Sequence, residues 1–167
     1  MKLNNIKASF IFKNNVIQNQ NKQVIWKNGN FTFTIYRRSR HLVNVTGLKS
    51  AEEVEQQKKL IEEQFQQKVL KVRIDNVFFS KKDYKNIDMC SLYKDLKENK
   101  DYFVSYDIEV FPGMYLHPND KQYPTIIMFR TGSFTIMGGK SLNVIYESEC
   151  FVRHLIEKYV KFSKNEK

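Results

Sequence analysis

Alternating apolar and polar residues mark a clear strand at residues 31–36, which read FTFTIY. A period of two is typical of a strand with one face on a core, so we expect Tyr36 and the two threonines to share the opposite face. The preceding Asn28-Gly29 predicts a type I′ hairpin turn, because both residues tolerate a positive φ. Residues 24–26 should therefore pair with this strand, and the valines within residues 43–45 should continue the sheet.

A helical pattern begins at Ser50. Ser50 followed by Glu53 is a capping-box signature, and an apolar stripe predicts a helix that runs to about residue 68. The stripe consists of Val54, Ile61 and Phe65. Beyond this helix, the apolar residues return to the period of two that is typical of strands.

The second half of the chain alternates at residues 69–79 and 102–110, which predicts two more strands. Between them, residues 88–97 have helical spacing. The apolar side of this short helix consists of Met89, Leu92, Tyr93 and Leu96.

Two stretches, residues 31–65 and 125–159, share one order of events: strand, turn, strand, a small-residue turn ending in Lys-Ser, and helix. The turn GLKS at 47–50 corresponds to GGKS at 138–141. An internal repeat of this kind predicts two related structural units rather than one irregular domain.

The number of residues that separates corresponding positions of the two stretches is not constant. The distance along the chain from Asn5 to its counterpart Asn76 is shorter than that from Tyr36 to its counterpart Phe129, by about the length of a small helix and its loop. We expect the first repeat to lack that helix. The predicted domains are a shortened first repeat at 1–68, a second repeat at 69–162 and a charged tail at 163–167.

The charge of the chain predicts a polyanionic partner. It has 28 Lys and Arg against 18 Asp and Glu in 167 residues, a formal net charge of +10 and a pI of about 9.5. It lacks an apolar run that could span a bilayer and a secretory signal, so we expect a soluble, intracellular protein. Cys90 and Cys150 have no paired-cysteine spacing, and we interpret both as packing residues.

Nothing in the sequence supports catalysis or a cofactor. His41, His117 and His154 have no ligand-like spacing to cysteine or carboxylate, so we expect no metal site. There is no phosphate-binding glycine loop and no nucleophile elbow. We therefore predict that the protein is not an enzyme.

The segment FPGMYL at 111–116, followed by TIIMFRTGSFTIMGGKS at 125–141, resembles the second repeat of the TATA-box-binding protein family. The resemblance implies an α+β fold in which two pseudo-symmetric repeats form a saddle, with a curved antiparallel sheet on the concave side and helices on the convex side. It also implies a divergent initiation factor that binds and bends A·T-rich DNA through the minor groove and recruits a transcription factor IIB-like protein and RNA polymerase. The Asn, Lys and Ile usage suggests a large DNA virus or a fast-evolving microbe, and hence a nucleus, a cytoplasmic viral factory or a virion.

The resemblance assigns base contacts to Asn5 and Asn76. An amide donor suits A·T and T·A pairs, which show only acceptors in the minor groove. The alternative for a strand asparagine is a bulge or edge hydrogen bond. Phe111 and Phe129 correspond to the aromatic pair that the family inserts into the base stack, although a phenylalanine in a strand can also serve the core.

The first repeat departs from the family pattern. Tyr36 replaces one wedge phenylalanine, and its partner position falls in the polar run 19–22, so one DNA kink is in doubt. The valine that the family has two residues after each asparagine is Lys7 in the first repeat and Phe78 in the second. The DNA-facing set implied by the resemblance also includes Thr46, Ile127 and Met137.

Charged residues complete the predicted interface. The resemblance implies phosphate contacts near sheet ends and turns, although charge runs are often simply solvated. The candidates are Arg37, Arg38, Arg40, Lys49, Lys71, Arg73, Arg130 and Lys140. The segment with Asp107, Glu109 and Val110 resembles the acidic stirrup that binds transcription factor IIB, or else is a solvated turn.

Two other functions fit the same patterns. The chain could be a protein- or RNA-interaction module that does not bend DNA, which the altered first repeat would permit. It could also be an accessory subunit of a nucleic-acid enzyme. An RNA module should prefer single strands, whereas a minor-groove binder should prefer A·T-rich duplex.

Overall fold

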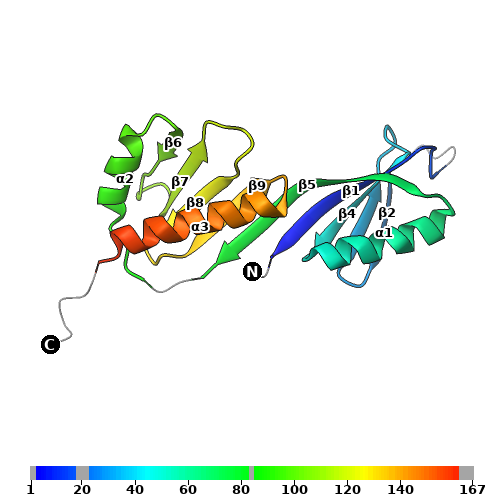
Figure 1. Ribbon diagram of the computed structural model, residues 1–167, viewed down its shortest axis with the longest axis horizontal. Coiled ribbons are helices and arrows are strands. Elements are labelled where there is room, and N and C mark those ends of the chain that lie inside the picture. The colour runs from blue at the N-terminus through cyan, green and yellow to red at the C-terminus, as the bar shows by residue number, and fades with distance from the viewer. Residues whose placement is uncertain (1–2, 18–22, 83–84, 162–167) are drawn as a thin grey trace. The chain divides into compact units, whose positions relative to one another are not determined.

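The computed structural model describes residues 3–17, 23–82 and 85–161 (Figure 1). These residues form nine strands and three helices, which makes the fold α+β, as predicted. The elements are β1 (Asn5–Phe12), β2 (Val24–Asn28), β3 (Phe31–Ile35), β4 (Leu42–Leu48), α1 (Ala51–Phe65), β5 (Val69–Lys81), α2 (Met89–Glu98), β6 (Tyr102–Ser105), β7 (Gly113–Pro118), β8 (Thr125–Phe129), β9 (Phe134–Gly139) and α3 (Leu142–Tyr159).

The chain divides into two compact units, unit 1 (Met1–Val77) and unit 2 (Phe78–Lys167), with the boundary inside β5. The strand order is β2-β3-β4-β1-β5 in unit 1 and β5-β9-β8-β7-β6 in unit 2. The compact units are defined by packing, whereas the predicted repeat boundary at residue 68 concerns sequence correspondence and stays a prediction.

Unit 1 buries one face of its strands under α1, which lies beside them in Figure 1. Phe10, Phe33 and Val45 on the strands are fully buried, as is Ile61 on the helix. Trp26 stacks on Phe33 with their ring centroids 4.9 Å apart. This packing confirms the predicted direction of the apolar faces. The pairing of residues 24–26 with residues 33–35 confirms that the two predicted strands are neighbours.

Helix α1 begins as predicted and ends earlier. The Ser50 Oγ accepts a hydrogen bond from the Glu53 backbone N–H at 3.2 Å, and the Glu53 carboxylate accepts from the Lys49 N–H at 2.6 Å. The helix stops at Phe65 rather than near residue 68, because Gln66 takes a left-handed conformation with φ of 50°.

The predicted hairpin turn is wrong in register and type. Asn28 pairs with Phe31, so the two central turn residues are Gly29 and Asn30. Gly29 has φ of 56°, but Asn30 does not have a positive φ, which a type I′ turn needs at both positions.

Unit 2 also packs its strands against a helix, and it has more elements than unit 1. Its strands β6 to β9 are antiparallel, and Leu116, Ile126, Phe134 and Ile136 bury one face of this sheet. Helix α3 supplies the buried Val152 to the same core. Figure 1 shows α2 and α3 on the unit 2 strands.

The predicted short helix is confirmed as α2. Asp88 caps it, because its Oδ1 accepts a hydrogen bond from the Ser91 N–H at 3.2 Å. This bond, with help from Lys161 at 3.2 Å, holds the pKa of Asp88 below its usual value. In unit 1, the described residues between β1 and β2, which are 13–17 and 23, form neither a helix like α2 nor a strand like β6.

Two further predictions are corrected. The strand predicted over 102–110 ends at Ser105, because the chain turns at Asp107, whose carbonyl accepts hydrogen bonds from the N–H groups of Val110 and Phe111. Cys90 and Cys150 are exposed rather than packed, because they lie on the outer sides of α2 and α3. No helix in the described part of the chain is long and apolar enough to cross a membrane.

Candidate nucleic-acid interface

Unit 2 presents one sheet face that its helices do not cover. Along β8, Ile126 and Met128 point into the core, so the residues that alternate with them point to the opposite face. We call this the open face of unit 2. It carries Gly113, Tyr115, Thr125, Ile127, Phe129, Thr135 and Met137, joined across β7, β8 and β9 by register.

An aromatic cluster occupies this open face. The Phe111 ring lies 5.9 Å from that of Phe129, at an interplanar angle of 63°, and 5.2 Å from that of Tyr115. Ile127 lies beneath these rings and is only 8% exposed. The structure therefore brings together Phe111, Phe129 and Ile127, three of the residues that the resemblance assigned to the DNA-facing set, and adds Tyr115.

Gly113 makes room for the cluster. It lies opposite Phe129 in the β7–β8 register. A Cβ at this position would be 2.5 Å from Phe111 Cε1, 2.9 Å from Ile127 Cγ2 and 3.0 Å from Phe129 Cε1. Only glycine fits without displacing these side chains. No motif in the sequence pointed to this role, although the alternation of β7 puts residues 113 and 115 on one face.

The corresponding place in unit 1 differs. Tyr36 is 44% exposed just after β3, and its predicted partner position in 19–22 lies outside the described residues. Val24 pairs with Ile35, so extending this register by one residue puts Gln23 opposite Tyr36. A glutamine thus takes the place that Gly113 holds in unit 2.

Asn5 is positioned by a hydrogen bond to a glycine. Its Oδ1 accepts from the Gly47 backbone N–H at 2.8 Å. Because a backbone N–H can only donate, this contact sets the amide orientation and makes Nδ2 the group directed to other acceptors. Asn76 and Phe78 are half-buried and alternate in β5 with the buried Val77, so they point away from the core.

The open face of unit 1 carries a polar row that the sequence analysis missed. The Ser9 hydroxyl lies 3.0 Å from Asn44 Oδ1 and within hydrogen-bonding distance of the Asp75 carboxylate. Ser9 and Asn44 are buried although both alternate with core residues. Asn44 also lies opposite Thr34 in the β3–β4 register. The signal in the sequence that could have indicated this row was the presence of polar residues inside three strands.

Arg73 completes the polar row, because its Nε donates to Asp75 Oδ1 at 2.6 Å.

The other predicted phosphate-binding cations are mostly exposed. Arg37, Arg38, Lys49, Arg130 and Lys140 lie at strand ends and turns, Lys71 is exposed within β5, and Arg40 is half-buried. Arg130 Nε donates to Asn86 Oδ1 at 3.3 Å. Thr46 and Met137 are half-buried near the ends of β4 and β9.

The segment Asp107–Val110 forms an exposed turn, which we call the acidic loop. The Asp107 carboxylate accepts a hydrogen bond from the Glu109 N–H at 3.0 Å. Ile108 and Val110 are 63% and 82% exposed. Two apolar side chains therefore stand in solvent beside two carboxylates, a combination typical of a protein contact.

A family model described as "Transcription factor TFIID (or TATA-binding protein, TBP)" matches residues 71–159, more than half of the chain. The chain belongs to the TATA-binding protein family. This confirms the resemblance seen in the sequence, while nothing in the comparisons supports a viral source. The TATA-binding protein family model covers all of the aromatic cluster and the acidic loop.

The fold comparison agrees with family membership. The structure is similar to one described as "Methanococcus jannaschii TBP", with a TM-score of 0.66 and 21% sequence identity, over 94% of this chain and 98% of that one. At this identity, the likeness shows a TATA-binding protein fold. No curated protein sequence matches the chain.

Among residues 3–17, 23–82 and 85–161, no group of three or more His, Cys, Asp or Glu could hold an ion.

Proposed function

We propose that this TATA-binding protein family member is a general transcription initiation factor that binds A·T-rich promoter DNA through the minor groove and bends it. The observation that carries the proposal is the pair Phe111 and Phe129, which stands over Gly113 on a face that no helix covers. We further propose that the two units are pseudo-symmetric repeats of one saddle, with both open faces toward DNA. Their matched order of strands and helix supports this.

The aromatic pair has the chemistry of a DNA wedge. Phe111 and Phe129 are half-buried on the side of the sheet away from the core. An apolar side chain inserted between base steps unstacks them and kinks the duplex, which widens the minor groove for the sheet. Gly113 keeps the two rings together at the position where they would enter one step.

The asparagines have the chemistry of A·T selection. With Oδ1 of Asn5 held by Gly47, its Nδ2 is the atom that would donate to adenine N3 or thymine O2. We assign Asn76 the same role at the corresponding place. Guanine would oppose such a donor, because it adds an amino group to the minor groove.

The basic side chains supply affinity without sequence preference. Arg37, Arg38 and Lys49 are exposed at turns of unit 1, and Arg130 and Lys140 at turns of unit 2. Contacts from such residues to phosphate release counterions, so the binding should weaken as salt rises. Phosphate contacts place the protein on the duplex, and the Asn and Phe contacts decide where.

We propose that the acidic loop binds a transcription factor IIB-like protein and so recruits RNA polymerase. Exposed Ile108 and Val110 offer apolar contact, and Asp107 and Glu109 would repel DNA. Changing both acids to lysine should weaken the binding of a cognate initiation factor, measured by pull-down on promoter DNA, while DNA binding itself persists. Unchanged factor binding would contradict this assignment.

The main test uses fluorescence anisotropy with a TATA-containing duplex and a G·C-rich duplex of equal length at one salt concentration. We expect binding to the TATA duplex to be at least about tenfold tighter. Energy transfer between end labels should rise as the duplex bends. Asn5→Ala and Asn76→Ala should reduce the preference for A·T pairs rather than the salt dependence.

Phe129→Ala should abolish the rise in energy transfer. Tyr146→Ala is the control, because Tyr146 is an exposed aromatic residue of α3, on the helix side of unit 2 rather than on its open face. Equal, purely salt-driven binding of both duplexes without bending would overturn the proposal. It would favour instead a protein- or RNA-interaction module built on the same fold.

A further inference from the structure

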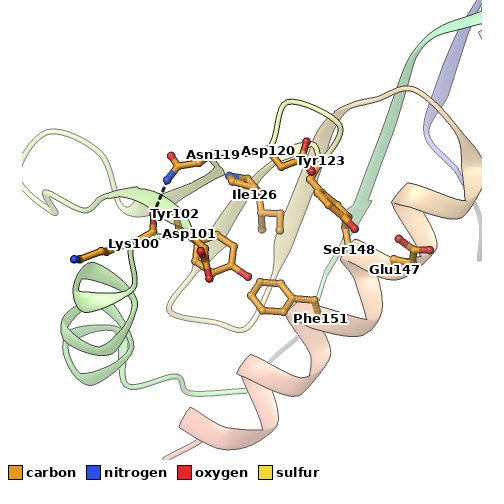
Figure 2. Close-up of a pocket in the computed structure, with 11 residues that line it drawn as sticks. Lys100, Asp101, Tyr102, Asn119, Asp120, Tyr123, Ile126, Glu147, Ser148 and Phe151 are labelled. Atoms are coloured by element: carbon orange, nitrogen blue, oxygen red, sulfur yellow. Dashed lines mark hydrogen bonds between the residues drawn. The ribbon is translucent and has the colours of Figure 1, made fainter.

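A cavity of about 440 Å³ opens between α3, the start of β6 and the β7–β8 loop (Figure 2). Ile126 lines it, and its neighbour Ile127 belongs to the aromatic cluster on the other side of the sheet. The cavity therefore lies on the helix side of unit 2. Nothing in the proposed DNA-binding function uses it.

Hydrogen bonds hold the walls of this cavity in place. Asn119 Nδ2 donates to the Lys100 carbonyl at 2.6 Å, and its backbone N–H donates to the Asp101 carbonyl at 2.9 Å. Asp120 closes the loop, because its Oδ1 accepts from the Gln122 N–H at 2.9 Å. The β7–β8 loop and the start of β6 are thus joined, and the cavity exists before any ligand arrives.

Aromatic rings form its interior. The rings of Tyr102 and Phe151 stack with centroids 5.7 Å apart and an interplanar angle of 18°. Figure 2 shows Tyr123 on the loop side of the same cavity. Ring faces attract cations, and they also pack well against the alkyl stem of a long basic side chain.

The charge around the cavity is opposite to that of the whole chain. Asp101, Asp120 and Glu147 line it, against one cation, Lys100. Each ion pair found within the described residues joins other groups, so none neutralises these three carboxylates. Burial raises the pKa of the Tyr102 hydroxyl, and the nearby Asp101 charge adds to the effect. A negative site on a protein of net charge +10 selects against phosphate and for a cation.

We propose that this cavity is a docking site for a lysine- or arginine-bearing segment of a partner protein. The three carboxylates that line the cavity would attract the cationic group, and the rings of Tyr102 and Phe151 would contact its alkyl stem. A protein segment fits better than a small amine, because β6 is the last strand in the unit 2 order and an extended segment can lie along its outer edge. The site lies away from the open face, so unit 2 can hold DNA and this partner together.

The test measures anisotropy of a fluorescein-labelled peptide, Gly-Gly-Leu-Lys-Leu-Gly-Gly, titrated with the full chain. Its Nε-acetyl-lysine form keeps the stem and loses the charge. We expect the unmodified peptide to bind roughly fivefold tighter than the acetylated one. Glu147→Gln and Asp101→Asn should each weaken it by up to roughly fivefold, and amide chemical shifts of Tyr102 and Phe151 should move on binding.

Glu157→Gln is the matched control, because Glu157 is exposed on α3 outside the cavity. It should leave peptide affinity unchanged. Equal affinity of the two peptides, or equal losses in Glu157→Gln and Glu147→Gln, would overturn the proposal. So would binding of spermidine without the peptide, since the occupant would then be a polyamine. TATA duplex binding is measured separately on the same variants, so failure here leaves the proposed DNA function untouched.

Discussion

On the open face of unit 2, two phenylalanines and a tyrosine surround Gly113, whereas the matching face of unit 1 carries a hydrogen-bonded polar row. The β2–β3 and β7–β8 registers make the correspondence specific. Ile25 pairs with Thr34 in unit 1, and Tyr115 pairs with Ile127 in unit 2. The two faces follow the same strand path with different side chains.

The core faces of the units do not diverge in this way. Each packs large apolar residues under its helix, such as Phe33 in unit 1 and Phe134 in unit 2. Burial of these side chains stabilises both units alike. An uncovered sheet face has no such requirement, so its composition reflects what it binds. Under the proposed function, unit 2 would therefore carry the DNA wedge, and unit 1 would contact DNA mainly through polar and charged groups.

The strongest way to break this comparison is to remove the space under the aromatic cluster. Gly113→Ala should displace Phe111 and Phe129, because its Cβ would lie 2.5 Å from the first ring. We expect a loss of about 1–3 kcal/mol in the free energy of unfolding from overpacking, together with loss of DNA bending. Denaturant titration and end-label energy transfer measure the two effects.

Gln23→Ala is the matched control for Gly113→Ala. Gln23 is exposed at the corresponding position of unit 1, so its truncation should change neither stability nor bending. If Gly113→Ala bends DNA as the parent chain does, the aromatic cluster is not the wedge. If Gln23→Ala abolishes bending instead, the assignment of the wedge to unit 2 is reversed.

A second prediction separates the units through the polar row. Asp75→Ala removes an acceptor from the buried Ser9 hydroxyl and leaves Arg73 without this carboxylate. We expect a loss of about 1–3 kcal/mol in unfolding free energy, confined to unit 1. Trp26 is the single tryptophan of the chain and lies in unit 1, so its fluorescence reports this loss.

A double-mutant cycle tests whether the polar row acts as one network. Ser9→Ala removes the hydroxyl that lies near both Asn44 and Asp75. With Asp75 already replaced, the Ser9 substitution should cost less than it does alone, because the two residues share a contact. Strictly additive losses would show that Ser9 and Asp75 are independent.

The smallest predicted effect concerns a feature that the two units share. Ser50 Oγ accepts from the Glu53 N–H at 3.2 Å, and Ser141 Oγ accepts from the Val144 N–H at 3.3 Å. Replacing either serine with alanine should cost about 1 kcal/mol. Thermal unfolding followed by circular dichroism should show similar losses, and only Ser50→Ala should shift the Trp26 signal. Clearly unequal losses would mean that the helix starts are not equivalent.

The elements of the fold were largely predictable from residue order. Period-two alternation identified β3 and β5, and the Ser-x-x-Glu signature identified the start of α1, because these signals depend only on neighbours along the chain. The segments at 111–116 and 125–141 together indicated the family. The extent of β6, the hairpin turn at Gly29 and the exposure of Cys90 were predicted wrongly, since each depends on packing around the element.

The candidate interface was predictable in its aromatic residues and not in its geometry. Phe111 and Phe129 could be assigned from the motif. The need for a glycine at position 113 follows only from the strand register, which places Gly113 opposite Phe129. Ser9, Asn44 and Asp75 come from three strands, and no spacing in the chain links them.

Residue order by itself indicated most of the strands and helices, the basic charge and the family. Tertiary structure alone decided which side chains meet: the cluster over Gly113, the polar row of unit 1 and the acidic cavity beside Phe151. The physical reason is that periodicity and capping act over a few residues, whereas register brings together atoms that are distant in sequence. A shift of one residue in register would turn each of these side chains to the other face.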